Sequence, residues 1–412
     1  MLLNRIWIGM FLVAFVVATC KLIFWQDMMV FKDLVDSLFS AAETGFTISI
    51  GLTGMICLWM GIMKVGEDGG AIRHLTRLVA PLFSRLFPEV PKDHPAVGAM
   101  MMNFSANMLG LDNAATPIGL KAMGELQKLN PEKEKASNAQ IMFLVLNTSG
   151  LTIIPVSVFA ILASNKMGSP SSVFLPILMA TYCASIIGLI MVSIRQKINL
   201  LNRVVLAYLG SITALLGALL YYITTHPENS ELISNLFGNT LIFVIIIGFI
   251  ILAVRKKVNV YESFVEGAKD GFAVAIKIIP YLIAMLAAIS VFRASGSMDA
   301  VLQGIRELAI MAGITALEWV DAMPVGLMKP LSGSGARAAL QDIINSHGAD
   351  SLQTKIAATM QGSTETTFYV LAVYFGSVGI KNTRYAAGVG LLADLAGIIA
   401  AIIISYLFYG NG

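Results

Sequence analysis

The residues best suited to chemistry are a carboxylate and its polar neighbours inside the apolar run of residues 355–376. The carboxylate is Glu365, in the segment QGSTETT. Its polar neighbours are Gln361, Ser363, Thr364, Thr366 and Thr367. An ionisable side chain within such a run is costly in a lipid bilayer, and this position is typical of a site that binds a cation, a proton or a substrate. The alternative is a glutamate at the membrane interface that pairs with Arg337 or Lys355.

A second carboxylate and a second polar segment lie in other apolar runs. Asp394 is midway along residues 385–409, where a salt bridge and a proton site are equally good interpretations. Residues 146–152 read LNTSGLT and contain no carboxylate; their polar members are Asn147, Thr148, Ser149 and Thr152. If this segment meets Glu365, one side of the site supplies hydroxyl and carbonyl ligands and the other supplies the charge. That composition suits a sodium ion or a proton together with a polar solute.

Residues 95–125 are too polar for one clean membrane helix and too hydrophobic for an exposed loop. The polar side chains crowd a stretch that ends at Pro117, and they are Asn103, Ser105, Asn107, Asp112, Asn113 and Thr116. This pattern predicts a re-entrant hairpin, in which Asp112 or Asn113 caps the second half-helix and Pro117 lies in its first turn. The candidate ligands here are Asn103, Asn107, Asp112 and Asn113. An ordinary cytoplasmic turn with capping side chains is the alternative.

Residues 324–346 form a second interrupted region. Their centre reads SGSG, from Ser332 to Gly335, and Arg337 follows on the half-helix that emerges. Backbone N–H groups at the N-terminus of a half-helix suit an anionic or hydrogen-bonding ligand, so Ser332, Ser334 and Arg337 are candidate binding residues. A Gly/Ser-rich tip is also common in plain loops.

The composition places all these residues in a membrane protein. Of 412 residues, 57% are hydrophobic and 13% are charged, whereas a soluble domain carries about 25% charged residues. Most of the outer surface must therefore face lipid. The net charge is +3, and Lys and Arg gather in short stretches between apolar runs, so nucleic acid is not an expected partner. Cys20, Cys57 and Cys183 lie in apolar runs without metal-ligand spacing, so we expect no disulfide, no metal centre and no cofactor beyond a coupling sodium ion or proton.

About twenty apolar residues cross the hydrocarbon layer as a helix. Runs of this length are residues 5–24, 46–64, 140–164, 173–194, 203–223, 237–254, 273–292, 355–376 and 385–409. The predicted fold class is an all-α polytopic membrane protein, with about nine transmembrane helices and two re-entrant or broken helical hairpins. Residues 31–39 and 75–86 have the amphipathic spacing of helices that lie flat at the membrane interface.

The distribution of Lys and Arg predicts the orientation. The first run could be a cleaved signal peptide, but its length and the interfacial pattern of residues 21–25 favour an uncleaved span. Basic residues concentrate in residues 121–135, 195–203 and 255–257, which should be cytoplasmic, whereas residues 225–231 lack Lys and Arg and should lie outside. Alternating spans then put the N-terminus in the cytoplasm and the C-terminus outside.

Two parts of the sequence are similar to each other. Residues 36–46, DSLFSAAETGF, align without a gap on residues 262–272, ESFVEGAKDGF. On the predicted topology the following spans run in opposite directions, which is the inverted repeat common in secondary transporters. We expect residues 1–200 to form the first repeat, residues 201–236 a linking span and an external loop, and residues 237–412 the second repeat. Chance similarity between apolar segments is the alternative.

Four segments carry a resemblance to a known family. They are NFSANMLGLDNAATPIGLKAM, LNTSGLTIIP, KPLSGSGA and QGSTETTFYVLAVYFGSVG. The first two resemble the spore maturation A proteins and the last two the B proteins, with Lys329 where Arg is expected, as if both were fused in one chain. The resemblance covers almost the whole chain and implies membership of the nucleoside recognition, or Gate, group, which includes concentrative nucleoside transporters. It implies solute-facing roles for Gln361, Ser363, Thr364 and Glu365.

Three functions follow as hypotheses. The first is a secondary transporter of the bacterial inner membrane for a small polar, nucleoside-like solute, coupled to sodium or protons. The second is a membrane component without solute flux that acts in spore or envelope maturation through protein partners. The third, an intramembrane enzyme, has no HExxH, GxSxG or paired-aspartate motif, so we expect no enzyme. The expected partners are the lipid bilayer and a small solute, and a homo-oligomer is compatible with the sequence.

Overall fold

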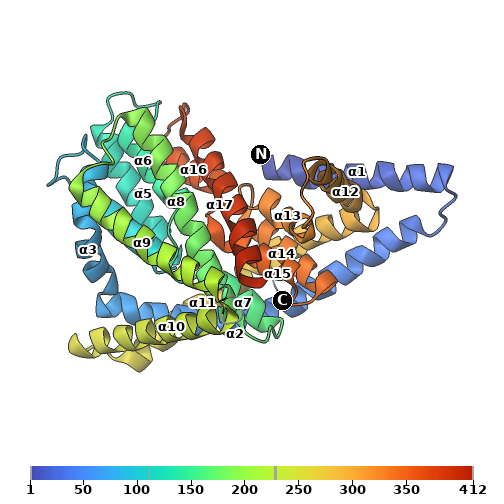
Figure 1. Ribbon diagram of the computed structural model, residues 1–412, viewed down its shortest axis with the longest axis horizontal. Helices are drawn as coiled ribbons and strands as arrows, with labels where there is room; N and C mark the ends of the chain where they lie inside the picture. The colour runs from blue at the N-terminus through green and yellow to red at the C-terminus, as the bar shows by residue number, and fades with distance from the viewer. Residues whose placement is uncertain (1, 111, 227–229, 411–412) are drawn as a thin grey trace.

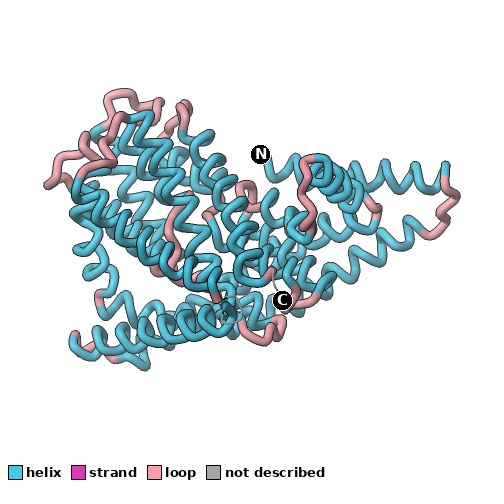
Figure 2. Tube along the Cα trace, in the orientation of Figure 1, coloured by secondary structure: helices cyan, strands magenta, loops and turns pink. Residues whose placement is uncertain are grey.

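The computed structural model describes residues 2–110, 112–226 and 230–410, and every regular element in them is a helix (Figures 1 and 2). The first half contains α1 (Leu2–Phe24), α2 (Val30–Gly69), α3 (Ala71–Leu86), α4 (Pro95–Met108), α5 (Asp112–Leu129), α6 (Asn138–Thr148), α7 (Val156–Ser164), the short 3-10 helix η1 (Pro170–Val173) and α8 (Phe174–Gln196). Helix α9 (Arg203–Thr225) follows. The second half contains α10 (Ser230–Arg255), α11 (Val260–Ala294), α12 (Ser297–Met311), α13 (Glu318–Met328), α14 (Gly333–His347), α15 (Leu352–Ser363), α16 (Thr367–Ser377) and α17 (Ala386–Tyr409).

The helices long enough to cross a membrane agree with the predicted spans. Among the described residues these are seven, namely α1, α2, α8, α9, α10, α11 and α17. The remaining predicted spans, residues 140–164 and 355–376, are each split into two shorter helices, α6 with α7 and α15 with α16. Helix α4 packs on α5, and α13 on α14, as the two predicted hairpins. The prediction of an all-α polytopic membrane fold is confirmed.

The order of elements in the first half recurs in the second. Helices α1 to α8 correspond in order to α10 to α17, and α9 lies between the two sets. Residues 36–46 lie within α2 and residues 262–272 within α11, an offset of 226 residues between Asp36 and Glu262.

Helices α2 and α11 cross closely and run antiparallel. A Cβ atom on Gly45 would lie 2.8 Å from Ile283, and one on Gly271 would lie 2.9 Å from Cys57, so an early part of each helix meets a late part of the other. The offset of 226 residues carries Gly45 onto Gly271 and Cys57 onto Ile283. Two contacts related in this way are the mark of a two-fold axis between equivalent surfaces. The halves are therefore inverted relative to each other around the α2–α11 crossing.

The amphipathic stretch of residues 31–39 was expected as a separate interfacial helix, and that expectation is wrong. These residues continue without a break into the apolar run as part of α2, which has 40 residues. No proline interrupts the stretch, so the helix continues. At about 1.5 Å per residue α2 is about 60 Å long, roughly twice the thickness of the hydrocarbon layer. The second stretch is the separate helix α3, which follows Gly70 in the left-handed conformation and buries Phe83 and Leu86 on one face.

The second parts of the two broken helices lie at the boundary between the halves. Helix α7 packs mainly on α2 of its own half and, through Val158 to Leu162, joins a core that also contains α13, α14 and α15. Helix α16 packs, through Val370 to Phe375, into the core formed by α3, α4, α5 and α6, and it lies beside α5 and α6 in Figure 1. These contacts bring the middle of both broken helices to the boundary between the halves.

Candidate functional site

The first hairpin turns where the sequence predicts. Helix α4 ends at Met108, Gly110 takes the left-handed conformation with φ +72°, and α5 begins at Asp112. The tip rests on the first broken helix, because the Met108 carbonyl accepts a hydrogen bond of 2.8 Å from the Ile153 N–H. The predicted capping side chains, Asp112 and Asn113, lie outside the part of the structure that is described at side-chain level.

The first broken helix is opened by a long non-helical segment, residues 149–155. Its freed main-chain carbonyls are satisfied by hydroxyl groups of α8. The Thr181 hydroxyl donates to the Gly150 carbonyl at 2.8 Å, and the Ser185 hydroxyl donates to the Ser149 carbonyl. Thr152 also faces this side, since its N–H points to the Thr181 hydroxyl at 3.4 Å. The predicted binding residues Ser149 and Thr152 therefore help to hold the break open.

The second hairpin has its tip at the predicted Ser-Gly segment. Ser332 is the N-cap of α14, and its hydroxyl accepts a hydrogen bond of 3.0 Å from the Gly335 N–H and lies 3.1 Å from the Ser334 hydroxyl. This tip rests on the second broken helix, because the Pro330 carbonyl accepts a hydrogen bond of 3.0 Å from the Phe368 N–H. Each hairpin tip thus supports the broken helix of its own half.

Arg337 lies apart from the other candidates. Its half-buried side chain lines a cavity of about 100 Å³ between α2, α7 and α11, which the tip of the first hairpin also reaches through Gly110. The predicted ligand Arg337 therefore belongs to the contact between the second hairpin and the opposite half.

Glu365 lies in the gap of the second broken helix. Helix α15 ends at Ser363 and α16 begins at Thr367, so Glu365 is in the middle of the discontinuous span. Its N–H donates a hydrogen bond of 2.8 Å to the Thr148 carbonyl, which joins the two breaks directly. The side chain is half-buried, and within the described residues it forms no ion pair with Arg337, Lys355 or any other cation.

Asp394 of α17 reaches the same place from a third helix. The carboxyl is 1% exposed, and its Oδ2 accepts a hydrogen bond of 2.6 Å from the Thr367 hydroxyl. The hydroxyls of Thr367 and Thr148 are 2.6 Å apart. A continuous line of oxygen atoms therefore leads from Asp394 through Thr367 to Thr148, across the boundary between the halves.

A second polar group connects the first hairpin to both broken helices. The Asn107 side-chain amide donates to the Asn147 Oδ1 at 2.6 Å, and the Tyr374 hydroxyl lies 3.3 Å from the same oxygen. The Asn103 amide donates to the Tyr374 hydroxyl at 3.2 Å and to the Ala115 carbonyl at 2.7 Å. Asn103, Asn107 and Asn147 were predicted from the sequence, whereas Tyr374 was missed because an aromatic residue in an apolar run gives no signal of its own.

Several buried polar atoms in this region have no hydrogen-bond partner among the described residues. They are Asn103 Oδ1, Gln361 Oε1, Thr364 Oγ1 and Asp394 Oδ1. Ser363, in contrast, donates to the Met360 carbonyl of its own helix, and Thr366 is the N-cap of α16 with its side chain against the second hairpin tip at Gly333. Thr367, which the sequence indicated only as a polar neighbour of Glu365, is central, because it links Asp394 to Thr148.

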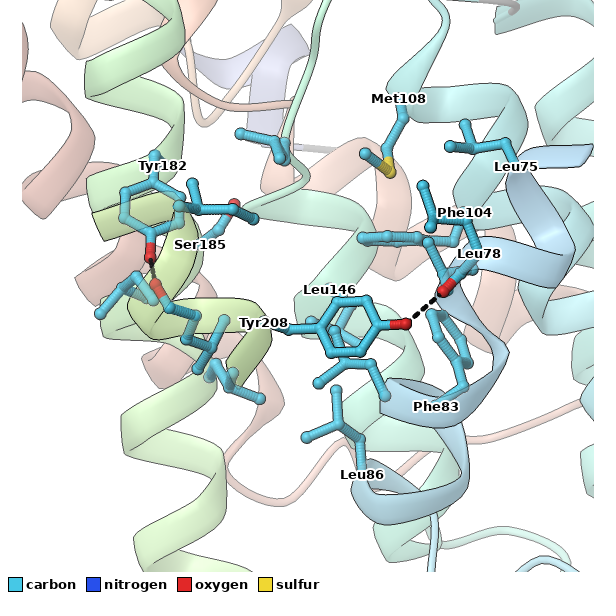
Figure 3. Close-up of a pocket in the computed structure, with 17 residues that line it drawn as sticks. Leu75, Leu78, Phe83, Leu86, Phe104, Met108, Leu146, Tyr182, Ser185 and Tyr208 are labelled. Atoms are coloured by element: carbon cyan, nitrogen blue, oxygen red, sulfur yellow. Dashed lines mark hydrogen bonds between the residues drawn. The ribbon is translucent and has the colours of Figure 1, made fainter. Parts of the chain in front are cut away.

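A larger cavity of about 150 Å³ lies elsewhere, between α3, α8 and α9 (Figure 3). Its walls are almost entirely apolar, and its hydroxyl groups are already engaged. The Tyr208 hydroxyl donates to the Leu78 carbonyl at 2.6 Å, and the Tyr182 hydroxyl donates to the Leu209 carbonyl at 2.8 Å (Figure 3). A polar solute needs convergent donors and acceptors, so the polar centre at the two breaks is the candidate site.

Two inverted halves, two hairpins and two broken helices that meet at a buried polar centre define an all-α polytopic membrane protein built from an inverted repeat. The family described as Gate, nucleoside recognition, matches residues 49–165 and 275–381, which together are more than half of the chain. The second matched segment starts 226 residues after the first, which is the offset of the structural repeat. The chain belongs to the nucleoside recognition family.

Two relatives from Bacillus subtilis (strain 168) extend the match. Spore maturation protein B is 46% identical over 179 residues, which are 98% of that protein and 43% of this chain. Spore maturation protein A is 36% identical over 185 residues, which are 91% of that protein and 45% of this chain. The predicted similarity to both spore maturation proteins is confirmed. No solved structure matches the chain.

Proposed function

We propose that the protein is an ion-coupled secondary transporter for a small polar solute, with nucleosides as the first class to test. The observation that carries the proposal is the direct hydrogen bond between the two breaks, from the Glu365 N–H to the Thr148 carbonyl. Non-helical main chain survives at membrane depth only inside protein or beside water. A pair of such segments, one from each inverted half, is the arrangement in which transporters bind a solute and expose it alternately to the two sides.

The proposed roles follow from the chemistry of the side chains. Within the part of the chain that the structure describes, Glu365 supplies a carboxylate that forms no ion pair, and Gln361 and Thr364 supply buried polar atoms without hydrogen-bond partners. Such groups are costly in apolar surroundings unless a ligand satisfies them. Solute hydroxyl and amide groups could complete their hydrogen bonds. We assign the solute contacts to this side of the centre.

Orientation and domain division complete the proposal. The N-terminus is placed in the cytoplasm of a bacterial cell and the C-terminus outside, with residues 1–200 and 237–412 as the two repeats. A reporter enzyme that works only outside the inner membrane, fused to the C-terminus, should be active. A silent reporter next to an active cytoplasmic one would reverse the orientation.

The names of the two relatives refer to spore maturation, and they favour a second candidate, a membrane component without solute flux. Uptake by the purified full chain in liposomes separates the candidates. Nucleosides, nucleobases and small acids are screened under a sodium gradient, a proton gradient or neither. Uptake that depends on one gradient supports a transporter, and impermeability to every solute under every gradient favours the second candidate.

Glu365→Gln is the decisive variant in this assay. The amide keeps the shape and removes the charge, so we expect coupled uptake to fall to the level of empty liposomes while the thermal unfolding midpoint stays within error. The matched control is Glu307→Gln, at an exposed position of α12, which should transport normally. Unchanged uptake by Glu365→Gln would remove Glu365 from the mechanism.

A further inference from the structure

Asp394 is the most completely buried carboxyl group at the polar centre. It lies in the middle of α17, is 1% exposed, and has one described hydrogen bond, at Oδ2 from Thr367. Its second oxygen, Oδ1, has no partner among the described residues, and none of their cations forms an ion pair with it. A buried carboxylate with an unpaired oxygen is strongly disfavoured relative to the neutral acid.

The groups around the Asp394 carboxyl are mostly uncharged. Its neighbours are hydroxyl groups, those of Thr364 in the second break, Thr367 of α16 and Thr148 of α6, and α8 presents Ala184 one turn further along. The Thr364 hydroxyl lies beside the carboxyl but outside hydrogen-bond geometry. The charged groups that act on the carboxyl are Lys329, from the end of α13, and Glu365. Their charges have opposite signs, so they offset each other.

Helix α17 packs closely against the second break on either side of Asp394. Gly390 and Gly397 lie one turn to either side of Asp394 on the same face of the helix. A Cβ atom on Gly390 would be 2.7 Å from Thr367, and one on Gly397 would be 3.0 Å from Thr364. A bound proton adds almost no volume, so its uptake by Asp394 is compatible with this close packing.

The carboxyl is also connected to the opposite half. Thr367 donates to Asp394, so Thr148 must donate its hydroxyl hydrogen to Thr367, at 2.6 Å. Thr148 is also the residue whose carbonyl accepts the Glu365 N–H. Loss of the proton from Oδ1 would leave a charge that needs a new donor, and the Thr364 hydroxyl, which has no hydrogen-bond partner among the described residues, lies beside the carboxyl. That rearrangement would displace Thr364, which is next to Glu365, the residue through which the second break contacts the first half.

We propose that Asp394 is a proton-binding site, and that the proton held on its Oδ1 is the coupling ion of the transporter. This inference rests on the proposed transport function. A proton arrives from water on one side, binds Oδ1 of the carboxylate to give the neutral acid, and leaves to water on the other side after the halves have moved. Thr367 is a positioning residue, because its hydroxyl holds Oδ2 in place and links the protonation state of Asp394 to the Thr148 hydroxyl.

The proton itself is the probe in the decisive experiment. Infrared difference spectra of the full chain in lipid nanodiscs are recorded over a pH series, and the carbonyl stretch of a neutral carboxyl is followed. We expect one buried band that disappears at high pH, is absent in Asp394→Asn, and is kept in the control Asp93→Asn, at an exposed position. Thr367→Val should move the pH of the transition, and Thr367→Ser, which restores a hydroxyl, should return it.

Uptake measurements then separate this inference from the proposed function. Proton-driven uptake that Asp394→Asn abolishes, with no effect of replacing sodium by potassium at fixed pH, supports the inference. A titrating band in a chain that transports nothing would overturn the transport proposal and leave the proton site. Sodium-driven uptake, or the absence of any band that depends on Asp394, would overturn the proton site and leave transport intact.

Discussion

The two broken helices have the same place in the repeat and opposite ways of satisfying their main chain. The first break, residues 149–155, is closed within its own half, by the hydroxyls of Thr181 and Ser185 and by the tip of the first hairpin. The second break, residues 364–366, is shorter, and its Glu365 N–H is satisfied by the first half, at Thr148. The first break is satisfied by groups of its own half, whereas the second depends on a carbonyl group of the other half.

The difference indicates that the two symmetry-related halves have different roles in the site. The first break contains no carboxylate; its polar side chains are the hydroxyl groups of Ser149 and Thr152, and its carbonyls at residues 149 and 150 accept hydrogen bonds. The second contains Glu365 and lies next to Asp394, and polar atoms of Gln361 and Thr364 have no hydrogen-bond partner among the described residues. Rigid segments position a ligand, and unsatisfied polar groups bind it or change with it. We infer that the first half acts as the scaffold of the site and the second half as its chemically active part.

The largest effect on stability should come from opening the support of the first break. The double variant Thr181→Val, Ser185→Ala leaves the carbonyls of Gly150 and Ser149 without donors, and each buried unsatisfied group costs about 1–3 kcal/mol. We expect a loss of that size per site in the free energy of unfolding, measured in mixed micelles. The control Ser211→Ala, on the exposed face of α9, should change nothing. An unaffected double variant would mean that the first break is not closed by α8.

The next effect concerns the symmetric crossing that holds both breaks in register. Gly271→Ala places a Cβ atom 2.9 Å from the backbone of Cys57, and its symmetry mate Gly45→Ala places one 2.8 Å from Ile283. Overpacking of this kind costs about 1–3 kcal/mol. Both variants should lower the thermal unfolding midpoint, and Gly271→Ala should lower it more, because its Cβ atom meets the backbone of Cys57 whereas the nearest atom at Gly45 belongs to the Ile283 side chain. Gly54→Ala, in α2 with open space around it, should be neutral or stabilising. A neutral Gly271→Ala variant would contradict the close packing of α2 on α11.

The features that could be predicted from the sequence are those set by local interactions, and the features that could not are set by non-local ones. Spans and hairpins were predicted because hydrophobic runs and Gly, Pro or Asn interruptions are local signals. Both broken helices were predicted as continuous spans with polar residues near their centres. The first is held open by two hydroxyl groups of α8, about one span further along the chain, and this contact is not visible in the local sequence. Likewise, residues 31–39 have the pattern of an interfacial helix, but nothing in that pattern says whether the helix continues.

The charged residues of the candidate site could be predicted from the sequence, whereas the hydrogen bonds that connect them could not. Glu365 and Asp394 were found because carboxylates are rare in apolar runs. The contacts that connect them were not. Thr367 meets Thr148 across 219 positions of the sequence, and Tyr374 meets Asn103 across 271. The sequence indicated Thr367 only as a neighbour of Glu365 and did not indicate Tyr374, because a threonine or tyrosine is unremarkable in a membrane helix.

A smaller effect tests the link of the first hairpin to the second half. Tyr374→Phe removes the hydroxyl that lies between Asn103 and Asn147 and leaves the ring, which stacks on Phe143. The loss should be about 1 kcal/mol of unfolding free energy, since the amides keep other partners. Uptake should be retained, because this group positions the scaffold. A variant with normal stability and no uptake would instead place the Tyr374 hydroxyl in contact with the solute.

The smallest effect tests the equivalent link on the other side. Asn165, at the end of α7, and Gln341 of α14 exchange two hydrogen bonds of 2.8 and 2.7 Å, and they join the first broken helix to the second hairpin. A double-mutant cycle with Asn165→Ala and Gln341→Ala should give a coupling free energy of about 0.6 kcal/mol, the usual size for hydrogen bonds between membrane helices. Either single substitution removes the same pair of hydrogen bonds. The uptake rate should therefore change by the same factor in both single variants. Different factors would mean that the two residues act separately, and that α7 is not held by the second hairpin.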